Sequence, residues 1–385
     1  MGVKTNNFSE ILRLTGYSLF IITYSFFYYT QLAMETDLSS IASIFRGGVF
    51  AILFLGLFFR KYSIREIVLT IILLFLGVYV SIQNKSIDIL VTLFLVVTMR
   101  QIEFNKIVKV DFYTRLISTV VIATLSIGKF IPTLQMYRSG NVRESFGFYH
   151  PNLFGAYILI LTIEFIYLGY LKNRETYRIW LALPITWFID KFTDDRSVEI
   201  GLLIFFCLYF ILKMPFFRVM TSKFYKLATI VTIVFFSFIS LFSVYQYNPM
   251  SSFWIIINKL LSRRLELIST VVKDFYPINW LGQKTPLLGD TGVIVNGATK
   301  FLYVDNSYMS ILIKFGIFIF VIFILWMLRN SFSFFNGKNR VIMFCWLVAM
   351  LAWGLSENKL ILVQFNILLF SYFERNKEEL KCKNT

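Results

Sequence analysis

The chain has 385 residues, of which 57% are hydrophobic and 16% are charged, and its formal net charge is +16. A soluble domain contains about 45–50% apolar and about 25% charged residues, so the composition excludes an ordinary soluble globular protein. There is a single histidine, and the three cysteines, Cys207, Cys345 and Cys382, show neither a metal-binding spacing nor a disulfide framework. We therefore expect neither a zinc nor a haem site, and no cofactor.

Long apolar runs follow one another along the whole chain. A bilayer core of about 30 Å is crossed by roughly 20 apolar residues in a helix, and backbone polar groups in lipid must be paired within such helices. The runs predict an all-α polytopic membrane protein, a single transmembrane domain over residues 1–385 with about 12 transmembrane helices. The expected spans are 11–30, 41–59, 66–82, 87–99, 115–132, 153–171, 177–190, 197–213, 226–245, 307–328, 341–355 and 358–373.

The first run is interpreted as a retained span. Only Lys4 and Arg13 precede it as basic residues, and no cleavage site of small residues follows it, so it does not have the pattern of a removed signal peptide.

Basic residues lie mainly in alternate loops between these runs. With the N-terminus inside, the inner loops carry Arg60, Lys61, Arg65, Lys106, Lys109, Lys172, Arg174, Lys213, Arg218, Lys223, Arg329, Lys338 and Arg340. The positive-inside rule then predicts that both termini are cytoplasmic. The positive net charge is thus interpreted as a topology signal, assisted by anionic lipid, and no nucleic-acid partner is expected.

Three polar segments fall outside in this orientation. They are residues 143–152 (RESFGFYHPN), the turn 193–197 (TDDRS) and the large outer loop 246–306. No comparable polar cluster lies inside, and no GxxxxGK[ST] loop exists, so we expect external chemistry that does not use ATP bound to this chain. In the large loop, apolar residues at helical spacing predict an amphipathic helix over about 253–275, which would lie on the membrane surface or cap the bundle.

His150, the single histidine, lies in the first of these segments. Its ordinary pKa near 6.5 makes it the natural general base at neutral pH. Asn152, after Pro151, is placed to cap the following span and would hold the imidazole near the membrane surface. The alternative is an ordinary hydrogen-bonded loop residue.

Arginines are the candidate ligands for an anionic substrate, because a guanidinium binds phosphate oxygens bidentately. Arg46 lies within the second span, where a central charge costs about 2.5–3.5 kcal/mol, so it is expected to face a cavity. For any single arginine, the alternative is a solvated or snorkelling charge. The outer arginines are Arg138, Arg143, Arg196, Arg263 and Arg264.

Outer carboxylates are few. A glycosidase needs two of them, one to protonate a poor leaving group, whereas a sugar on a diphosphate needs cations that stabilise the departing phosphate charge. One histidine with several arginines suits the second reaction better. Asp194 and Asp195 are interpreted as a solvated turn, with a metal site as the alternative, and Glu164 and Glu199 are lesser candidates.

Three stretches of the chain, in this order, resemble bacterial polysaccharide polymerases of the Wzy type, within the superfamily that includes the O-antigen ligases. They are RESFGFYHPNLFG (143–155), INKLLSRRLEL…WLGQK (257–284) and VDNSYMSILIKFGI (304–317). The resemblance implies a metal-independent, GT-C-like membrane glycosyltransferase of the bacterial cytoplasmic membrane. Such enzymes join oligosaccharide repeat units carried on undecaprenyl diphosphate at the outer face, and work beside a flippase and a chain-length regulator.

The resemblance also implies roles for individual residues. Arg196 stands in Asp-Asp-Arg-Ser where these proteins often have Ser-Arg-Thr, and Arg263 stands where a small residue is more usual. Either arginine of the 263–264 pair could therefore be the functional one. The expected catalytic residues are His150, Arg143, Arg196 and Arg264. The expected substrate-binding residues are Arg46, Arg138, Asn152, Arg263, Asp305, Asn306 and Tyr308.

Two alternatives stay open from the sequence. A ligase of the same superfamily would transfer a finished glycan to another acceptor, and the sequence does not identify the acceptor. A flippase or other transporter often shows paired halves or broken helices near the middle of the membrane, and the sequence shows neither clearly.

Overall fold

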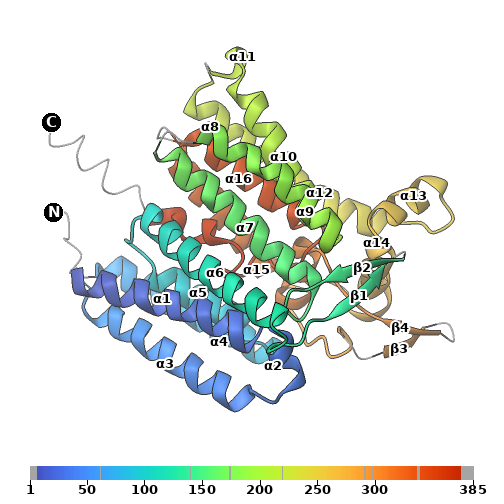
Figure 1. Ribbon diagram of the computed structural model, residues 1–385, viewed down its shortest axis with the longest axis horizontal. Helices are drawn as coiled ribbons and strands as arrows, with labels where there is room; N and C mark the ends of the chain where they lie inside the picture. Colours follow the sequence, from blue (N-terminus) through green and yellow to red (C-terminus); the bar gives the residue numbers. More distant parts are fainter. Residues whose placement is uncertain are drawn as a thin grey trace.

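The computed structural model describes residues 7–60, 62–138, 140–172, 175–218, 220–289, 292–295, 298–335 and 339–373. These residues form a bundle of α-helices with two small antiparallel hairpins. Both hairpins lie on the right of Figure 1, at one end of the bundle. The prediction of an all-α architecture is confirmed for the bundle, but the hairpins were not predicted. Lys61, Arg174, Lys338 and Cys382 lie outside the described residues.

The first half of the chain contains the helices that pack around α1. The order is α1 (Asn7–Phe27), α2 (Gln31–Glu35), α3 (Ser39–Phe58), α4 (Ile64–Asn84), α5 (Asp88–Thr98), α6 (Phe104–Ile127), the hairpin β1 (Gln135–Arg138) and β2 (Asn141–Glu144), and α7 (Pro151–Tyr170). Small residues bring α1 and α3 close together, since Gly16 faces Leu53 and Gly56 faces Arg13. Ser63 and Glu66 form a capping box that begins α4.

The second half contains shorter and more irregular elements. The order is α8 (Glu175–Arg178), the 3₁₀ turn η1 (Ile179–Leu181), α9 (Ala182–Phe192), α10 (Arg196–Lys213), α11 (Pro215–Arg218), α12 (Ser222–Gln246), α13 (Ser252–Leu260), α14 (Arg264–Thr270), the π-helical turn η2 (Val271–Phe275), the hairpin β3 (Gly292–Val295) and β4 (Ala298–Phe301), α15 (Ser307–Phe334), α16 (Arg340–Trp353) and the 3₁₀ helix η3 (Ile367–Phe373).

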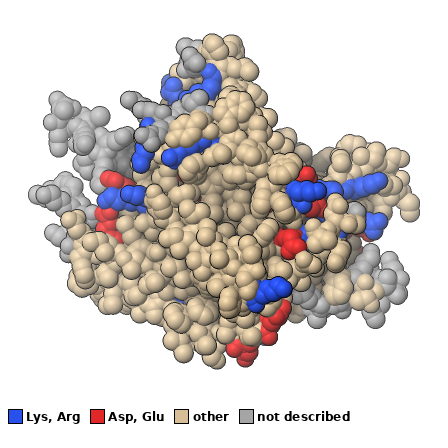
Figure 2. Space-filling view, viewed as in Figure 1, with Lys and Arg blue, Asp and Glu red and all other residues tan. Residues whose placement is uncertain are grey.

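The helices give the protein the character of a membrane-embedded bundle. Among the described residues, six helices are long and apolar enough to cross a membrane, namely α3, α4, α6, α7, α12 and α15, and α5 and α16 are shorter apolar helices. In Figure 2 a wide uncharged zone separates the charged residues on the left and top from those on the right and at the bottom. Every predicted span except the last overlaps an α-helix.

The last predicted span, 358–373, is wrong as a transmembrane helix. Residues 354–366 form turns, and only 367–373 are helical, as the 3₁₀ helix η3. Its polar groups bond to other elements instead of to a helix of their own. Ser307 accepts from the backbone N–H of Leu360 at 3.0 Å, and the backbone carbonyl of Gln364 accepts from Arg115 at 2.9 Å.

The predicted amphipathic helix over 253–275 is also wrong in part, because it is broken in the middle. Ser262 and Arg263 have φ angles of 54° and 63°, which a continuing right-handed helix excludes. The side chain of Asn258 accepts from the N–H of Glu266 at 3.0 Å and so fixes the start of α14. The break turns α14 towards the bundle, where Leu265 and Ile268 are buried.

A charged cluster lies inside the bundle itself. Arg115 on α6 is fully buried and pairs with Asp111 at 2.9 and 3.0 Å. Tyr17 on α1 donates to the same carboxylate at 2.8 Å. Glu164 on α7, also fully buried, interacts electrostatically with both members of the pair. This network joins α1, α6 and α7 where lipid would otherwise make charges costly.

Candidate functional site

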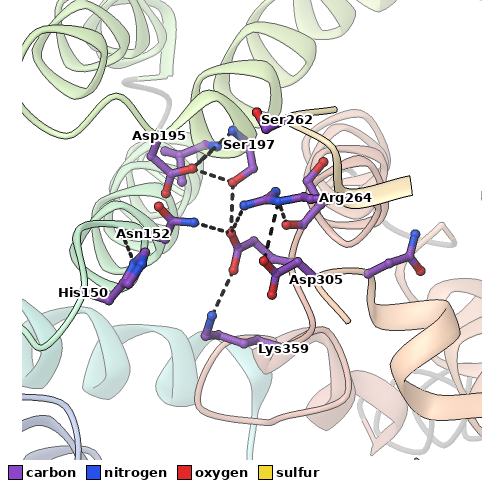
Figure 3. Close-up of polar contacts among 12 residues, drawn as sticks. His150, Asn152, Asp195, Ser197, Ser262, Arg264, Asp305 and Lys359 are labelled. Carbon is purple, nitrogen blue, oxygen red and sulfur yellow. Dashed lines mark hydrogen bonds and ion pairs between the residues drawn. The ribbon is translucent and has the colours of Figure 1, made fainter. Parts of the chain in front are cut away.

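A polar site lies at the hairpin end of the bundle, where the N-termini of α7 and α10 meet α14 and the turn that follows α16. Figure 3 shows His150 and Asn152 on one side of this site and Arg264, Asp305 and Lys359 on the other. Asp195 and Ser197 complete it from the start of α10. Because each α-helix leaves its first N–H groups unpaired, these side chains serve both as caps and as site residues.

His150 is the N-cap of α7, and its Nδ1 accepts from the backbone N–H of Asn152 at 3.1 Å. A neutral imidazole that accepts at Nδ1 carries its proton on Nε2. Burial, together with the nearby Arg143 and Lys359, lowers the pKa of His150 to about 4. The imidazole is thus neutral at pH 7, with an N–H donor and no free lone pair.

Arg143 reaches the site from β2 and is buried. Its Nε donates to the carbonyl of Thr193 at 2.7 Å, and its Nη2 donates to the Oδ1 of Asn152. Asn152 therefore connects the β1–β2 hairpin to α7. The predicted grouping of Arg143, His150 and Asn152 agrees with this placement.

Glu357 is the centre of the site, although it was not predicted. Its side chain is only 3% exposed, and its carboxylate accepts from Asn152 Nδ2 and Lys359 Nζ, both at 2.9 Å. Ser197 Oγ lies 3.4 Å from the same carboxylate and Arg264 Nη2 lies 3.5 Å from it. Although burial opposes ionisation, Lys359 and Arg264 hold the pKa of Glu357 below its usual value.

Arg264 lies on the opposite wall, and its contacts with carboxylates are longer than the Lys359–Glu357 pair. Its Nε is 3.6 Å from Asp305 Oδ2, and its Nη2 is 3.5 Å from Glu357 Oε1. Charge-assisted hydrogen bonds are shorter, about 2.7–2.9 Å, so both contacts are loose ion pairs. Its Nη1 donates to the carbonyl of Ser356. Burial and the nearby Glu357 raise the pKa of Asp305.

Asp195 caps α10 from beneath the site. Its Oδ1 accepts from the N–H groups of Ser197 and Val198 at 3.2 and 3.4 Å. Its Oδ2 is buried against Gly155 of α7 and, within the described residues, has no hydrogen-bond partner. Burial, followed by the nearby Glu357, raises the pKa of Asp195 to about 6. The expectation of a solvated turn is therefore wrong for this residue.

A second group of charges forms the rim of the site. Arg138 donates to the carbonyl of Asp194 at 3.1 Å and to the side chain of Ser262, which ties β1 to the break between α13 and α14. Arg196 Nε lies 3.6 Å from Asp194 Oδ1, with its side chain 54% exposed. Within the described ranges, no three His, Cys, Asp or Glu residues are placed to hold a metal ion.

Other candidates lie apart from this centre. Asn306 caps α15 and bonds to Ser240 and Leu355, and Tyr308 is fully buried with its hydroxyl on the carbonyl of Leu351 at 3.0 Å. Both have evident structural roles. Arg46 on α3 stacks over Tyr28 at 5.6 Å, and Arg263 is exposed at the start of α14.

Sequence reasoning missed Glu357 because it lies in the short gap between the predicted spans 341–355 and 358–373, and it missed Lys359 because this residue lies inside the second of them. The stretch that contains both is GLSENKLILVQFN (354–366). A glutamate and a lysine two residues apart at the edge of an apolar run were the available signal, since such charges in or near a span usually have a specific partner.

No protein-family model matches the chain, and neither a curated protein nor a solved structure matches it. The resemblance to polysaccharide polymerases therefore remains a prediction from three sequence motifs.

Proposed function

We propose that this protein is a membrane glycosyltransferase that polymerises oligosaccharide repeat units carried on undecaprenyl diphosphate. The observation that carries the proposal is the grouping of Arg143, Arg264 and Lys359 near the neutral imidazole of His150 at one end of a membrane bundle. Cations fixed in a partly buried site stabilise the charge that develops on a departing diphosphate. The outer face of a bacterial cytoplasmic membrane is the proposed location.

The proposed reaction is one displacement at the anomeric carbon of the growing chain. A sugar hydroxyl of the incoming unit forms the new glycosidic bond, the bond from the anomeric carbon to the diphosphate oxygen breaks, and the hydroxyl proton passes to the departing diphosphate. Arg264 is the main ligand of that diphosphate, because its ion pairs at 3.5 and 3.6 Å are loose enough to exchange.

His150 has a different role here from the general base that its type suggests. Its Nδ1 lone pair is engaged with Asn152, so Nε2 donates a hydrogen bond and cannot accept the hydroxyl proton. We propose that the Nε2–H donates a hydrogen bond to an oxygen of the substrate and so orients the substrate. One preorganised donor of this kind contributes about 10²–10³-fold to turnover.

A transporter of lipid-linked oligosaccharide is the second candidate. The non-helical Gly316 inside α15 and the buried Asp111–Arg115–Glu164 cluster favour it, since transporters use broken helices and charges within the membrane. Movement of the substrate across a vesicle without new glycosidic bonds would support this candidate. A ligase would use the proposed site with a different acceptor.

The test is polymerisation by the purified protein in liposomes, with an undecaprenyl-diphosphate repeat unit as substrate. We expect a ladder of products from the wild type, and loss of most of it in His150→Ala and Arg143→Ala. Lys259→Ala is the control, because this exposed lysine of α13 is not among the expected site residues. Full ladders from folded His150→Ala and Arg143→Ala proteins would show that the site is misplaced.

A further inference from the structure

Glu357 joins more elements of the site than any other described side chain there. Its carboxylate contacts Asn152 at the start of α7, Ser197 at the start of α10, and Arg264 at the start of α14. Its main-chain carbonyl also accepts from Ser307, the first residue of α15. The residue therefore lies where four helix N-termini meet.

The contacts of Glu357 fix the positions of the cationic side chains of the site. Lys359 binds one carboxylate oxygen at 2.9 Å, and Arg264 approaches the other at 3.5 Å. Asn152 transmits the same constraint to Arg143, because it donates to Glu357 with its Nδ2 and accepts from Arg143 with its Oδ1. One buried anion thus fixes three cations that come from different parts of the chain.

We propose that Glu357 is a positioning residue, which holds Arg143, Arg264 and Lys359 around a binding position for the diphosphate of the lipid-linked substrate. The proposal rests on the proposed function for the identity of that ligand. Glu357 itself is not the ligand or a proton acceptor, because its two oxygens are already occupied and its side chain is only 3% exposed. The diphosphate replaces Asp305, the more exposed partner, beside Arg264, whereas the contacts of Glu357 with Arg264 and Lys359 persist.

Removal of this charge has two opposite consequences. Glu357→Gln takes one negative charge from the site, so an anionic lipid should bind as well as before or more tightly. The three cations lose their common anchor, and misplacement by about 1 Å costs about 100-fold in rate. A residue that only stabilised the fold would lose binding and turnover together.

The experiment measures binding of undecaprenyl diphosphate, polymerisation kinetics and thermal unfolding in detergent for the wild type, Glu357→Gln and Glu357→Asp. We expect Glu357→Gln to have an unchanged or lower Kd and KM and a kcat about 100-fold lower, and Glu357→Asp to recover part of that kcat. Glu144→Gln is the control, since it removes the same charge from the hairpin β1–β2 at the same end of the bundle.

A second variant keeps the test decisive if Glu357→Gln does not fold. Glu357→Gln combined with Lys359→Met removes the ion pair as a whole, which proteins tolerate better than the loss of one partner. Its kcat should lie well below that of Lys359→Met alone, because Arg143 and Arg264 have also lost their anchor. Wild-type kcat in either folded variant would overturn the proposal, as would failure of the wild type to bind undecaprenyl diphosphate. A wild type that binds this lipid without making polymer would instead refute the proposed function alone.

Discussion

At the scale of single residues, the hydrogen bond at Nδ1 decides what His150 can do. Burial, Arg143 and Lys359 lower its pKa to about 4, so the imidazole stays neutral from pH 5 to 8. We expect the pH profile of kcat to show no limb near pH 6.5 that belongs to this residue. The measurement compares the wild type with His150→Asn, in which an amide can still cap α7. A tenfold fall per pH unit below 6.5, present in the wild type alone, would contradict this role.

Asp195 should make the stability of the protein depend on pH in the opposite sense from a paired carboxylate. Burial and Glu357 raise its pKa to about 6 in the folded protein, above the ordinary value of 3.8. The folded state therefore binds the proton more tightly, and this stabilisation is present below pH 3.8 and is lost as the pH rises through 6.

Asp195→Asn keeps an acceptor for the cap of α10 but cannot titrate. We expect the thermal midpoint of the variant, relative to that of the wild type, to rise between pH 5 and pH 7.5. Thermal unfolding in detergent at both pH values measures this difference. A constant gap between the two proteins across that range would contradict the assignment.

The sequence predicted the members of the site better than their roles. His150, Asn152, Arg143 and Arg264 do lie together, and their residue types and their loops on one predicted side had indicated this grouping. The tautomer of His150 depends on a hydrogen bond from the N–H of Asn152, and the sequence pattern does not determine that bond. Glu357 escaped notice because its partners on other helices are 50 to 205 positions away and become neighbours only after folding.

At the scale of elements, α15 shows how the large outer loop is fastened to the bundle. Gly316 has a φ of 86° inside this helix, and Gly282 in the loop has a φ of 78°. The N–H groups of Ile317 and Phe318, which the break leaves unpaired, donate to Asn279 and Trp280 at 2.9 and 3.1 Å. The motif WLGQK thus contacts the motif that contains Gly316.

We expect Gly316→Ala to destabilise the protein by about 3 kcal/mol, because a Cβ there is strained at positive φ and meets the backbone of Trp280 and Gly282. Gly47→Ala in α3 is the matched control, since nothing lies within 4 Å of its added Cβ. That control should be neutral or stabilise by about 1 kcal/mol or less. Equal unfolding free energies for the two variants in a detergent titration would contradict the packing seen at Gly316.

Apolar runs predicted most helices because lipid leaves few alternatives to a helix for an apolar segment. They could not predict where a segment stops being one helix. The segment 177–190 is an example, because the 3₁₀ turn η1 divides it into two helices. Pro184, shortly after that turn, has no N–H to donate to a helical hydrogen bond. The segment 358–373 is apolar enough for a span, yet its backbone polar groups form hydrogen bonds with Ser307 and Arg115.

At the scale of the whole molecule, the site and the basic start of α12 lie at opposite ends of the bundle. The hairpin β1–β2 and the N-termini of α7, α10 and α15 are at the site end, whereas α12 begins at the other end, near Lys223. The membrane orientation thus decides which compartment supplies the substrate. The excess of Lys and Arg in the inner loops predicts that the site faces outside.

Cysteine labelling tests this orientation directly. In a background with the three native cysteines replaced by serine, Asn141→Cys places a thiol at the exposed turn of the hairpin, and Lys223→Cys places one at the exposed start of α12. We expect a membrane-impermeant maleimide to label Asn141→Cys in intact cells, and Lys223→Cys only after permeabilisation. Because a site in the cytoplasm would not meet repeat units displayed on the outer face, the reverse pattern would refute both the orientation and the proposed polymerisation.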